Sequence, residues 1–139
     1  MPFRQFIPLV TLVTALISGC QGYDFKVNDT VVYRAPTPFT DFDVDDPALA
    51  ACIEQTIADQ DITRADDLKA LNCSHAGIAN LAGIEAFTRL RALRMSSNSI
   101  ADVEPLARLP DVLELYLADN QIENAAPLLQ LEKLTLLIR

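Results

Sequence analysis

Aliphatic residues recur at 22-residue intervals in the second half of the chain. Three segments align at this offset, beginning at Leu68, Leu90 and Val112, and a six-residue fourth segment begins at Leu134. Within each segment the pattern L-x-x-L-x-L places two aliphatic residues two positions apart. This alternation is typical of a short strand with one buried face, and it does not match the helical spacing of three or four residues.

One strand of this kind cannot bury its apolar face alone. Stacked copies extend a parallel sheet and enclose a continuous core behind it, so that each unit contacts only its neighbours. The sequence therefore predicts an α/β solenoid over residues 68–139, with three full repeats, a partial fourth and parallel strands on the concave face. Pro105 and Pro127 occupy equivalent positions and predict short helical or irregular returns on the convex side.

The extended pattern L-x-x-L-x-L-x-x-N-x-I, followed by Pro-Leu-x-x-Leu, is similar to leucine-rich repeats, and the 22-residue spacing resembles the internalin type. The resemblance covers residues 68–139. It places Asn98 and Asn120 in the asparagine column, where we expect the amides to bond backbone groups of the turn after the strand. Ala76 stands in that column in the first repeat, so we expect its turn to be held less tightly.

Residues 46–67 predict a helical cap at the N-terminal end of the solenoid. Asp46 is followed by proline, a combination that favours a helix start. Apolar residues at spacings of four then form one helix face, namely Leu49, Ile53 and Ile57. Internalin-like proteins have a similar cap, which supports this interpretation.

The first 19 residues have the features of a secretory signal peptide: one cation at Arg4, no acid and a short apolar centre. The run Ile17-Ser18-Gly19-Cys20 resembles the lipobox of bacterial lipoproteins. The resemblance implies lipidation of Cys20 and a lipid-anchored location in the bacterial cell envelope. Because Gln21 rather than Asp follows, it implies the outer membrane. The alternative is an ordinary signal peptide followed by a buried free thiol.

Residues 20–45 mix prolines, acids and short apolar runs without a sustained period, which predicts a flexible tether. The acidic run DFDVDD within residues 41–46 superficially resembles a calcium loop. It lacks the turn glycine and a terminal glutamate at the required offset, so we expect no metal site.

Two cysteines remain once Cys20 is assigned to lipid. Cys52 belongs to the predicted cap helix and Cys73 to the inward column of the first repeat. We expect them to form a disulfide in an oxidising compartment, where closing a loop of about 20 residues contributes roughly 3 kcal/mol. The alternative is two buried thiols.

Composition narrows the possible functions. The 139 residues include 11 Lys+Arg against 19 Asp+Glu, a net charge of −8, which argues against nucleic acid as a partner. No glycine-rich phosphate loop or zinc spacing is present. The one Ser/His neighbour pair, Ser74-His75, lies on a predicted strand, where adjacent side chains point in opposite directions. We therefore expect neither an enzyme nor a cofactor.

The strand residues that point away from the core are the candidates for function. They include Asn72, Arg94, Glu114 and Tyr116 on the concave face. Arginine and tyrosine are enriched in protein-binding hot spots, so this face predicts a protein–protein interaction module with an unknown protein partner. The alternatives are a structural envelope component that self-associates through its C-terminal edge strand, or a shortened member of a longer repeat family.

Overall fold

The chain divides into two compact units, residues 1–35 and 36–139. The computed structural model describes residues 25–27 and 30–138; the predicted signal peptide and Cys20 lie outside the described residues. In the first unit, β1 (Phe25–Val27) and β2 (Thr30–Tyr33) form an antiparallel pair. Among the described helices, none is long and apolar enough to span a membrane.

The second unit begins its regular structure with helix α1 (Pro47–Asp59). Its start matches the predicted residue: Oδ1 of Asp46 accepts hydrogen bonds from the backbone N–H groups of Ala48 and Leu49, at 2.8 and 3.2 Å. Proline fits the first helical position because the N–H it lacks would have no partner within the helix. The residues predicted to form the apolar face are buried, and α1 contacts the first strand of the following sheet.

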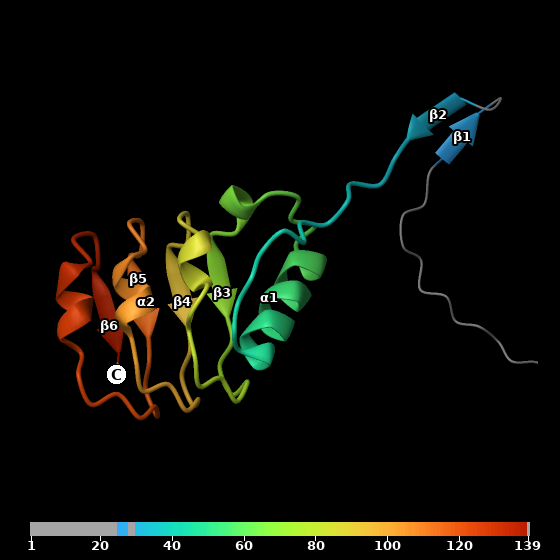
Figure 1. Cartoon of the computed structure of the whole chain (residues 1–139). Coiled ribbons are helices and arrows are strands. Elements are labelled where there is room, and N and C mark those ends of the chain that lie inside the picture. Colours follow the sequence, from blue (N-terminus) through green and yellow to red (C-terminus); the bar gives the residue numbers. More distant parts are fainter. Residues whose placement is uncertain (1–24, 28–29, 139) are drawn as a thin grey trace, which may run out of the picture. The chain divides into compact units, whose positions relative to one another are not determined.

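Four parallel strands follow α1 in sequence order. They are β3 (Ala70–Asn72), β4 (Ala92–Arg94), β5 (Glu114–Tyr116) and β6 (Leu136–Ile138). Each strand residue pairs with the residue 22 positions further on, as with Leu71 and Leu93, so the sequence period is also the register of the sheet. Figure 1 shows the strands side by side in this order, starting next to α1.

Short helical turns return the chain behind the sheet. They are η2 (Ile84–Ala86), α2 (Glu104–Ala107) and η3 (Ala126–Gln130), whereas η1 (Ala65–Asp67) connects α1 to β3. The core between sheet and returns consists of the repeating aliphatic columns, with Phe87 as its largest side chain. Fully burying a side chain of this kind contributes roughly 1.5–3 kcal/mol, so the repeated columns provide most of the driving force for stacking.

Part of the predicted tether differs from expectation. Residues 39–45 pack against the segment after α1 and against the first repeat: the N–H of Phe39 donates to the carbonyl of Ile62 at 2.8 Å, and the N–H of Asp45 donates to the carbonyl of Ala82 at 3.3 Å. The ring of Phe42 lies 5.6 Å from that of Phe87, and the ring of Phe39 lies 6.3 Å from it. These aromatic contacts bury apolar surface that a free tether would leave in water.

This docked segment explains a departure in the first repeat, where glycine replaces the proline of the later repeats. Gly83 has a φ of 97°, a conformation that favours glycine. A Cβ atom at this position would overlap the carbonyl oxygen of Asp43 and the backbone of Val44. Glycine is therefore required by the close approach of the segment that precedes α1.

Candidate functional site

The strands present a row of side chains on the face of the sheet that points away from the core. Asn72, Arg94 and Tyr116 are in register on β3, β4 and β5. The residue before each of them is a buried leucine, as strand alternation requires. The structure thus brings three of the four predicted binding residues into one line, which we call the outer row.

An arginine and a tyrosine are in contact within the outer row. The guanidinium carbon of Arg94 lies 5.1 Å from the centroid of the Tyr116 ring, within cation–π range. Arg94 is exposed and Tyr116 is half-buried. Stacking restricts the arginine without occupying its N–H groups, and these form no hydrogen bond with any described residue. The fork remains available to an acceptor on another molecule.

Glu114, the fourth predicted residue, lies at the start of β5, where its register partner on β4 is Ala92. It is half-buried and stands two residues before Tyr116, on the same face of the sheet. It therefore adds a carboxylate beside the outer row. Because the neighbouring residue Ala92 has a small side chain, little protrudes from the sheet next to this carboxylate.

A recess adjoins the other end of the outer row. Its volume is about 340 Å³, and we call it the helix–sheet recess because α1 and the sheet both contribute to it. Its lining residues are Thr56, Asp59, Gln60, Ala70, Leu71, Asn72 and Arg94. The predicted outward residues therefore form one wall, and the C-terminal part of α1, which sequence reasoning did not include, forms the other.

A disulfide joins these two walls. Cys52 on α1 and Cys73 directly after β3 are bonded, with their Cα atoms 5.9 Å apart and 21 residues of sequence separation. This confirms the predicted pairing and excludes the alternative of two buried thiols. The bond fixes the distance between helix and sheet at the recess.

Asparagine side chains hold the turns that follow the strands. Oδ1 of Asn98 accepts hydrogen bonds from the N–H groups of Ala76 and Ile78, at 3.1 and 3.0 Å. Its Nδ2 donates to the carbonyls of Cys73 and Met95, both at 2.9 Å. One amide thus joins the turn of its own repeat to the turn of the preceding repeat.

The turn of the first repeat receives hydrogen bonds from the asparagine amide of the next repeat, whereas the turn of the second repeat is also bonded by its own Asn98, at the carbonyls of Met95 and Ser96. Ala76 cannot supply an amide, but the asparagine that bonds this turn is Asn98 of the next repeat. Asn120 acts in the same way one repeat further on, where it accepts from the N–H of Ile100 at 3.0 Å. Both asparagines have the backbone role that the repeat pattern predicts.

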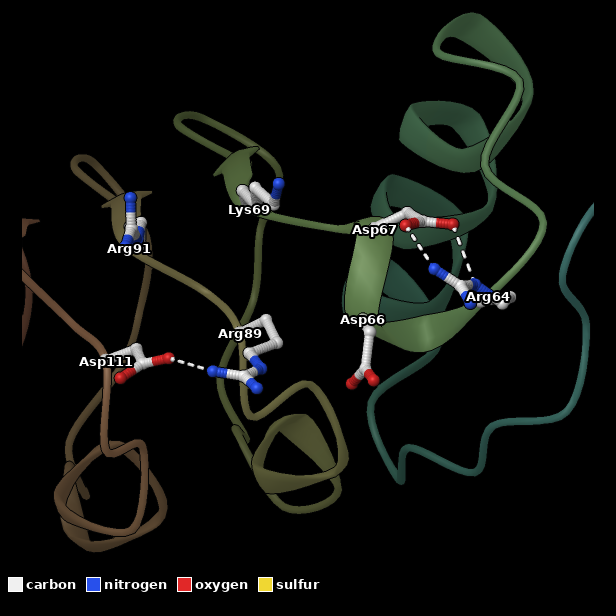
Figure 2. A pocket seen from close by; sticks show the side chains of 7 residues that line it. All are labelled: Arg64, Asp66, Asp67, Lys69, Arg89, Arg91 and Asp111. Carbon is white, nitrogen blue, oxygen red and sulfur yellow. Dashed lines mark hydrogen bonds and ion pairs between the residues drawn. The ribbon is translucent and has the colours of Figure 1, made fainter.

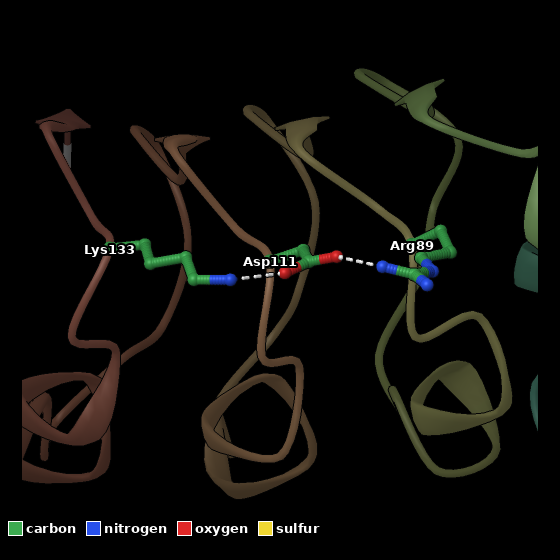
Figure 3. Close-up of polar contacts among 3 residues, drawn as sticks. All are labelled: Arg89, Asp111 and Lys133. Carbon is green, nitrogen blue, oxygen red and sulfur yellow. Dashed lines mark hydrogen bonds and ion pairs between the residues drawn. The ribbon is translucent and has the colours of Figure 1, made fainter.

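A second group of polar side chains lies where the chain enters the strands, and sequence reasoning did not identify it. Asp111 forms ion pairs with Arg89, at 3.1 Å, and with Lys133 (Figure 3). Hydrogen bonds from the Lys133 ammonium and the Arg89 guanidinium lower the pKa of the Asp111 carboxyl. These residues are 22 positions apart, so charge alternation in one repeat column was the signal available in the sequence.

Metal chemistry has no evident centre in the described part of the chain. Across residues 25–27 and 30–138, no group of three His, Cys, Asp or Glu side chains could hold a metal ion. Asp46, the last residue of the acidic run, is instead buried and accepts backbone hydrogen bonds.

No protein-family model and no curated protein matches this chain. Two crystal structures from Listeria monocytogenes strain 4b F2365 are similar to it. An internalin (inlF) aligns with a TM-score of 0.60 and 28% identity over 66% of this chain and 29% of its own. Internalin C2 aligns with a TM-score of 0.60 and 25% identity over 66% of this chain and 43% of its own.

The chain therefore spans less than half the length of either internalin. Their likeness and the parallel sheet in 22-residue register together define a leucine-rich repeat protein with a solenoid-type fold. This confirms the predicted class of fold.

Proposed function

We propose that this chain is a lipid-anchored protein of the bacterial cell envelope that binds another protein through the outer row. In this proposal residues 1–19 are the signal peptide, Cys20 bears the lipid in the outer membrane, and helix α1 is the N-terminal cap. Residues 68–139 are three full repeats and a partial fourth. The contact between Arg94 and Tyr116 is the observation that carries the binding function.

The physical argument rests on side chains that are large, exposed and already ordered. Tyrosine and arginine contribute most to binding when their contact geometry exists before the partner arrives, because less conformational entropy is then lost. Stacking on Tyr116 restricts Arg94, and its N–H groups remain open to carboxylate or carbonyl acceptors. The adjacent helix–sheet recess has room for one partner side chain.

The test compares a double variant with a charge-matched control. The full-length protein is crosslinked in its own cells, its partner is identified by mass spectrometry, and affinity is then measured with purified components. Arg94→Ala combined with Tyr116→Ala is expected to weaken binding at least tenfold, about 1.4 kcal/mol. Arg108→Ala removes one exposed cation outside the outer row and is expected to leave affinity unchanged. Equal affinities for wild type and double variant would rule out this face.

Lipidation is tested separately at Cys20. Replacement by serine removes the sulfur to which a lipid would be attached. We expect labelled fatty acid to be incorporated into the wild-type protein but not into Cys20→Ser, and the variant to leave the membrane fraction. Membrane retention without label would instead indicate an uncleaved or unlipidated signal segment.

Self-association is a second candidate function, favoured by exposed apolar residues near β6. Leu129 is 87% exposed, Leu137 37% and Ile138 42%. Among the described strands, none pairs with the outer edge of β6, and an apolar recess of about 360 Å³ lies beside it. Exposed strand edges of this kind favour pairing with a second copy of the chain.

Oligomeric state distinguishes this candidate from binding by the outer row. Multi-angle light scattering of the detergent-solubilised protein is expected to give a dimer that Leu129→Lys converts to a monomer, while Arg94→Ala leaves it dimeric. A wild-type monomer at all accessible concentrations would refute self-association.

A further inference from the structure

A polar cleft lies where the first two repeats enter their strands. Its volume is about 350 Å³, and it shares no lining residue with the outer row. Its lining residues are Arg64, Asp66, Asp67, Lys69, Arg89, Arg91 and Asp111, all shown in Figure 2. We call it the charged cleft. It contains four cations and three carboxylates, in a chain whose overall net charge is −8.

Two of the carboxylates in the charged cleft are already neutralised. Asp67 accepts two hydrogen bonds from Arg64, at 3.1 and 3.3 Å, and the bonded guanidinium lowers the pKa of the Asp67 carboxyl. Asp111 lies between Arg89 and Lys133. Figure 2 shows the Arg64–Asp67 and Arg89–Asp111 pairs at opposite sides of the cleft, and Figure 3 shows Asp111 between Arg89 and Lys133.

Two cations in the charged cleft have no hydrogen-bonded carboxylate among the described residues, although Lys69 lies near enough to Asp67 to help lower the pKa of its carboxyl. Lys69 and Arg91 occupy the same repeat column, and the N–H of Arg91 donates to the carbonyl of Lys69 at 2.8 Å, so the two residues are direct neighbours. Within the described residues neither side chain forms a hydrogen bond or an ion pair. Like charges on the residues that directly precede two adjacent strands repel each other, so an anion held between them would relieve this repulsion.

The pair does not follow from the repeat itself. The next two residues in the column of Lys69 and Arg91 are Leu113 and Thr135, so only the first two repeats place cations here. The cleft is therefore a local feature of the entrance to β3 and β4 rather than a repeated surface pattern.

We propose that the charged cleft binds the phosphate group of a small phosphate monoester, with Lys69 and Arg91 as its ligands. A monoester carries close to two negative charges at neutral pH and matches both cations, whereas a carboxylate carries one. Lysine supplies a point charge, and arginine supplies a planar fork that bonds two phosphate oxygens.

The size and polarity of the charged cleft define the rest of the ligand. A phosphate group fills only part of about 350 Å³, which is at the lower end of small-molecule sites. No aromatic or large aliphatic side chain lines the cleft, so the esterified part is expected to be a hydroxylated molecule such as glycerol or a sugar. The Asp66 carboxylate, which opposes an anion, limits the affinity.

The test is a calorimetric titration of the full chain, in detergent at low salt and pH 7.5, with three probes. Glycerol 3-phosphate is expected to bind, inorganic phosphate to bind more weakly, and glycerol not to bind. Lys69→Ala and Arg91→Ala are each expected to weaken glycerol 3-phosphate binding at least tenfold. Asp66→Asn is expected to strengthen it severalfold, because it removes a repulsive charge without changing the size of the side chain.

Matched controls separate a site from general charge effects. Arg108→Ala removes one exposed cation outside the cleft and is expected to leave binding unchanged; an equal loss of affinity in this variant would overturn the proposal. Absence of binding up to ~10 mM ligand would overturn it as well. Equal or tighter binding of inorganic phosphate would exclude the ester, and preference for an acidic peptide would assign the cleft to a protein partner instead. None of these outcomes bears on the outer row, because the two sites share no residue.

Discussion

The Asp46 carboxylate connects two parts of the fold, and its removal gives the sharpest test of the structure. Oδ1 accepts from the N–H groups of Ala48 and Leu49 at the start of α1. Oδ2 accepts from the N–H groups of Ala79 and Asn80, at 2.8 and 2.9 Å, in the first repeat. The residue is only 8% exposed, so water cannot easily replace these bonds.

The cost of Asp46→Ala follows from these four bonds. Loss of a helix N-cap costs about 1 kcal/mol, and each partly buried N–H left without an acceptor costs about 1 kcal/mol more. We therefore expect the free energy of unfolding to fall by about 3 kcal/mol. Asp46→Asn separates the two roles, because its oxygen still caps the helix while its amide N–H groups face other donors. Its expected loss is about 2 kcal/mol.

The assay is urea denaturation of the protein with its disulfide intact. A loss of stability lowers the midpoint concentration without changing the slope. Asp45→Ala is the matched control, because it removes the same charge from the exposed neighbouring residue and is expected to change stability by less than about 0.5 kcal/mol. If Asp46→Ala were no more destabilising than Asp45→Ala, the inferred role of the carboxylate would be refuted.

The same carboxylate predicts a dependence on pH. Burial raises the pKa of Asp46, but the four backbone N–H donors outweigh this effect, and the pKa lies below its ordinary value of 3.8. A lowered folded-state pKa means that the stabilisation is present above pH 3.8 and is lost as the pH falls through the folded-state pKa. The stability difference between wild type and Asp46→Asn should therefore stay constant above pH 3.8 and shrink as the pH falls below this value; a difference that remains constant below pH 3.8 would contradict the argument.

Three further predictions use the same urea assay. Gly83→Ala is expected to cost about 3 kcal/mol, because the added Cβ meets backbone atoms, whereas Gly77→Ala, with open space around it, should cost about 1 kcal/mol; equal losses would argue against the docked segment. Replacing Cys52 and Cys73 together by serine should cost about 3 kcal/mol, and reduction of the wild type should reproduce the loss. Asn98→Ala should cost about 3 kcal/mol, because the N–H groups of Ala76 and Ile78 and the carbonyl of Cys73 lose their amide partner; a loss below about 1 kcal/mol would show that water replaces the amide.

The features that could be predicted from the sequence are those that depend on neighbouring residues or on a periodic pattern of residues. The 22-residue recurrence from Leu68 onward predicted the parallel strands and their register, because each repeat must stack on its neighbour to bury its leucines. The Asp-Pro pair at residue 46 predicted the helix start, since an N-cap depends only on nearby backbone. Arg94 and Tyr116 could be placed side by side because they share a repeat column.

Other features required the tertiary structure, because they depend on segments that are distant in sequence. Phe42 packs against Phe87, and the backbone of the adjoining residues Asp43 and Val44 lies so close to position 83 that only glycine fits there. The first turn is held by the amide of Asn98 from the next repeat, a contact that the residue at position 76 does not predict.

The charged cleft belongs to the same group. Asp67 lies in the predicted cap and Lys69 and Arg89 lie in the repeats, and no local pattern in the sequence predicts that they line one cleft. The sequence alone determined the solenoid and its 22-residue period, because the same aliphatic positions are buried in every repeat. The tertiary structure decided which polar side chains meet. Hydrogen bonds and ion pairs between repeats depend on the distances between side chains of different repeats, and the sequence of one repeat does not give these distances.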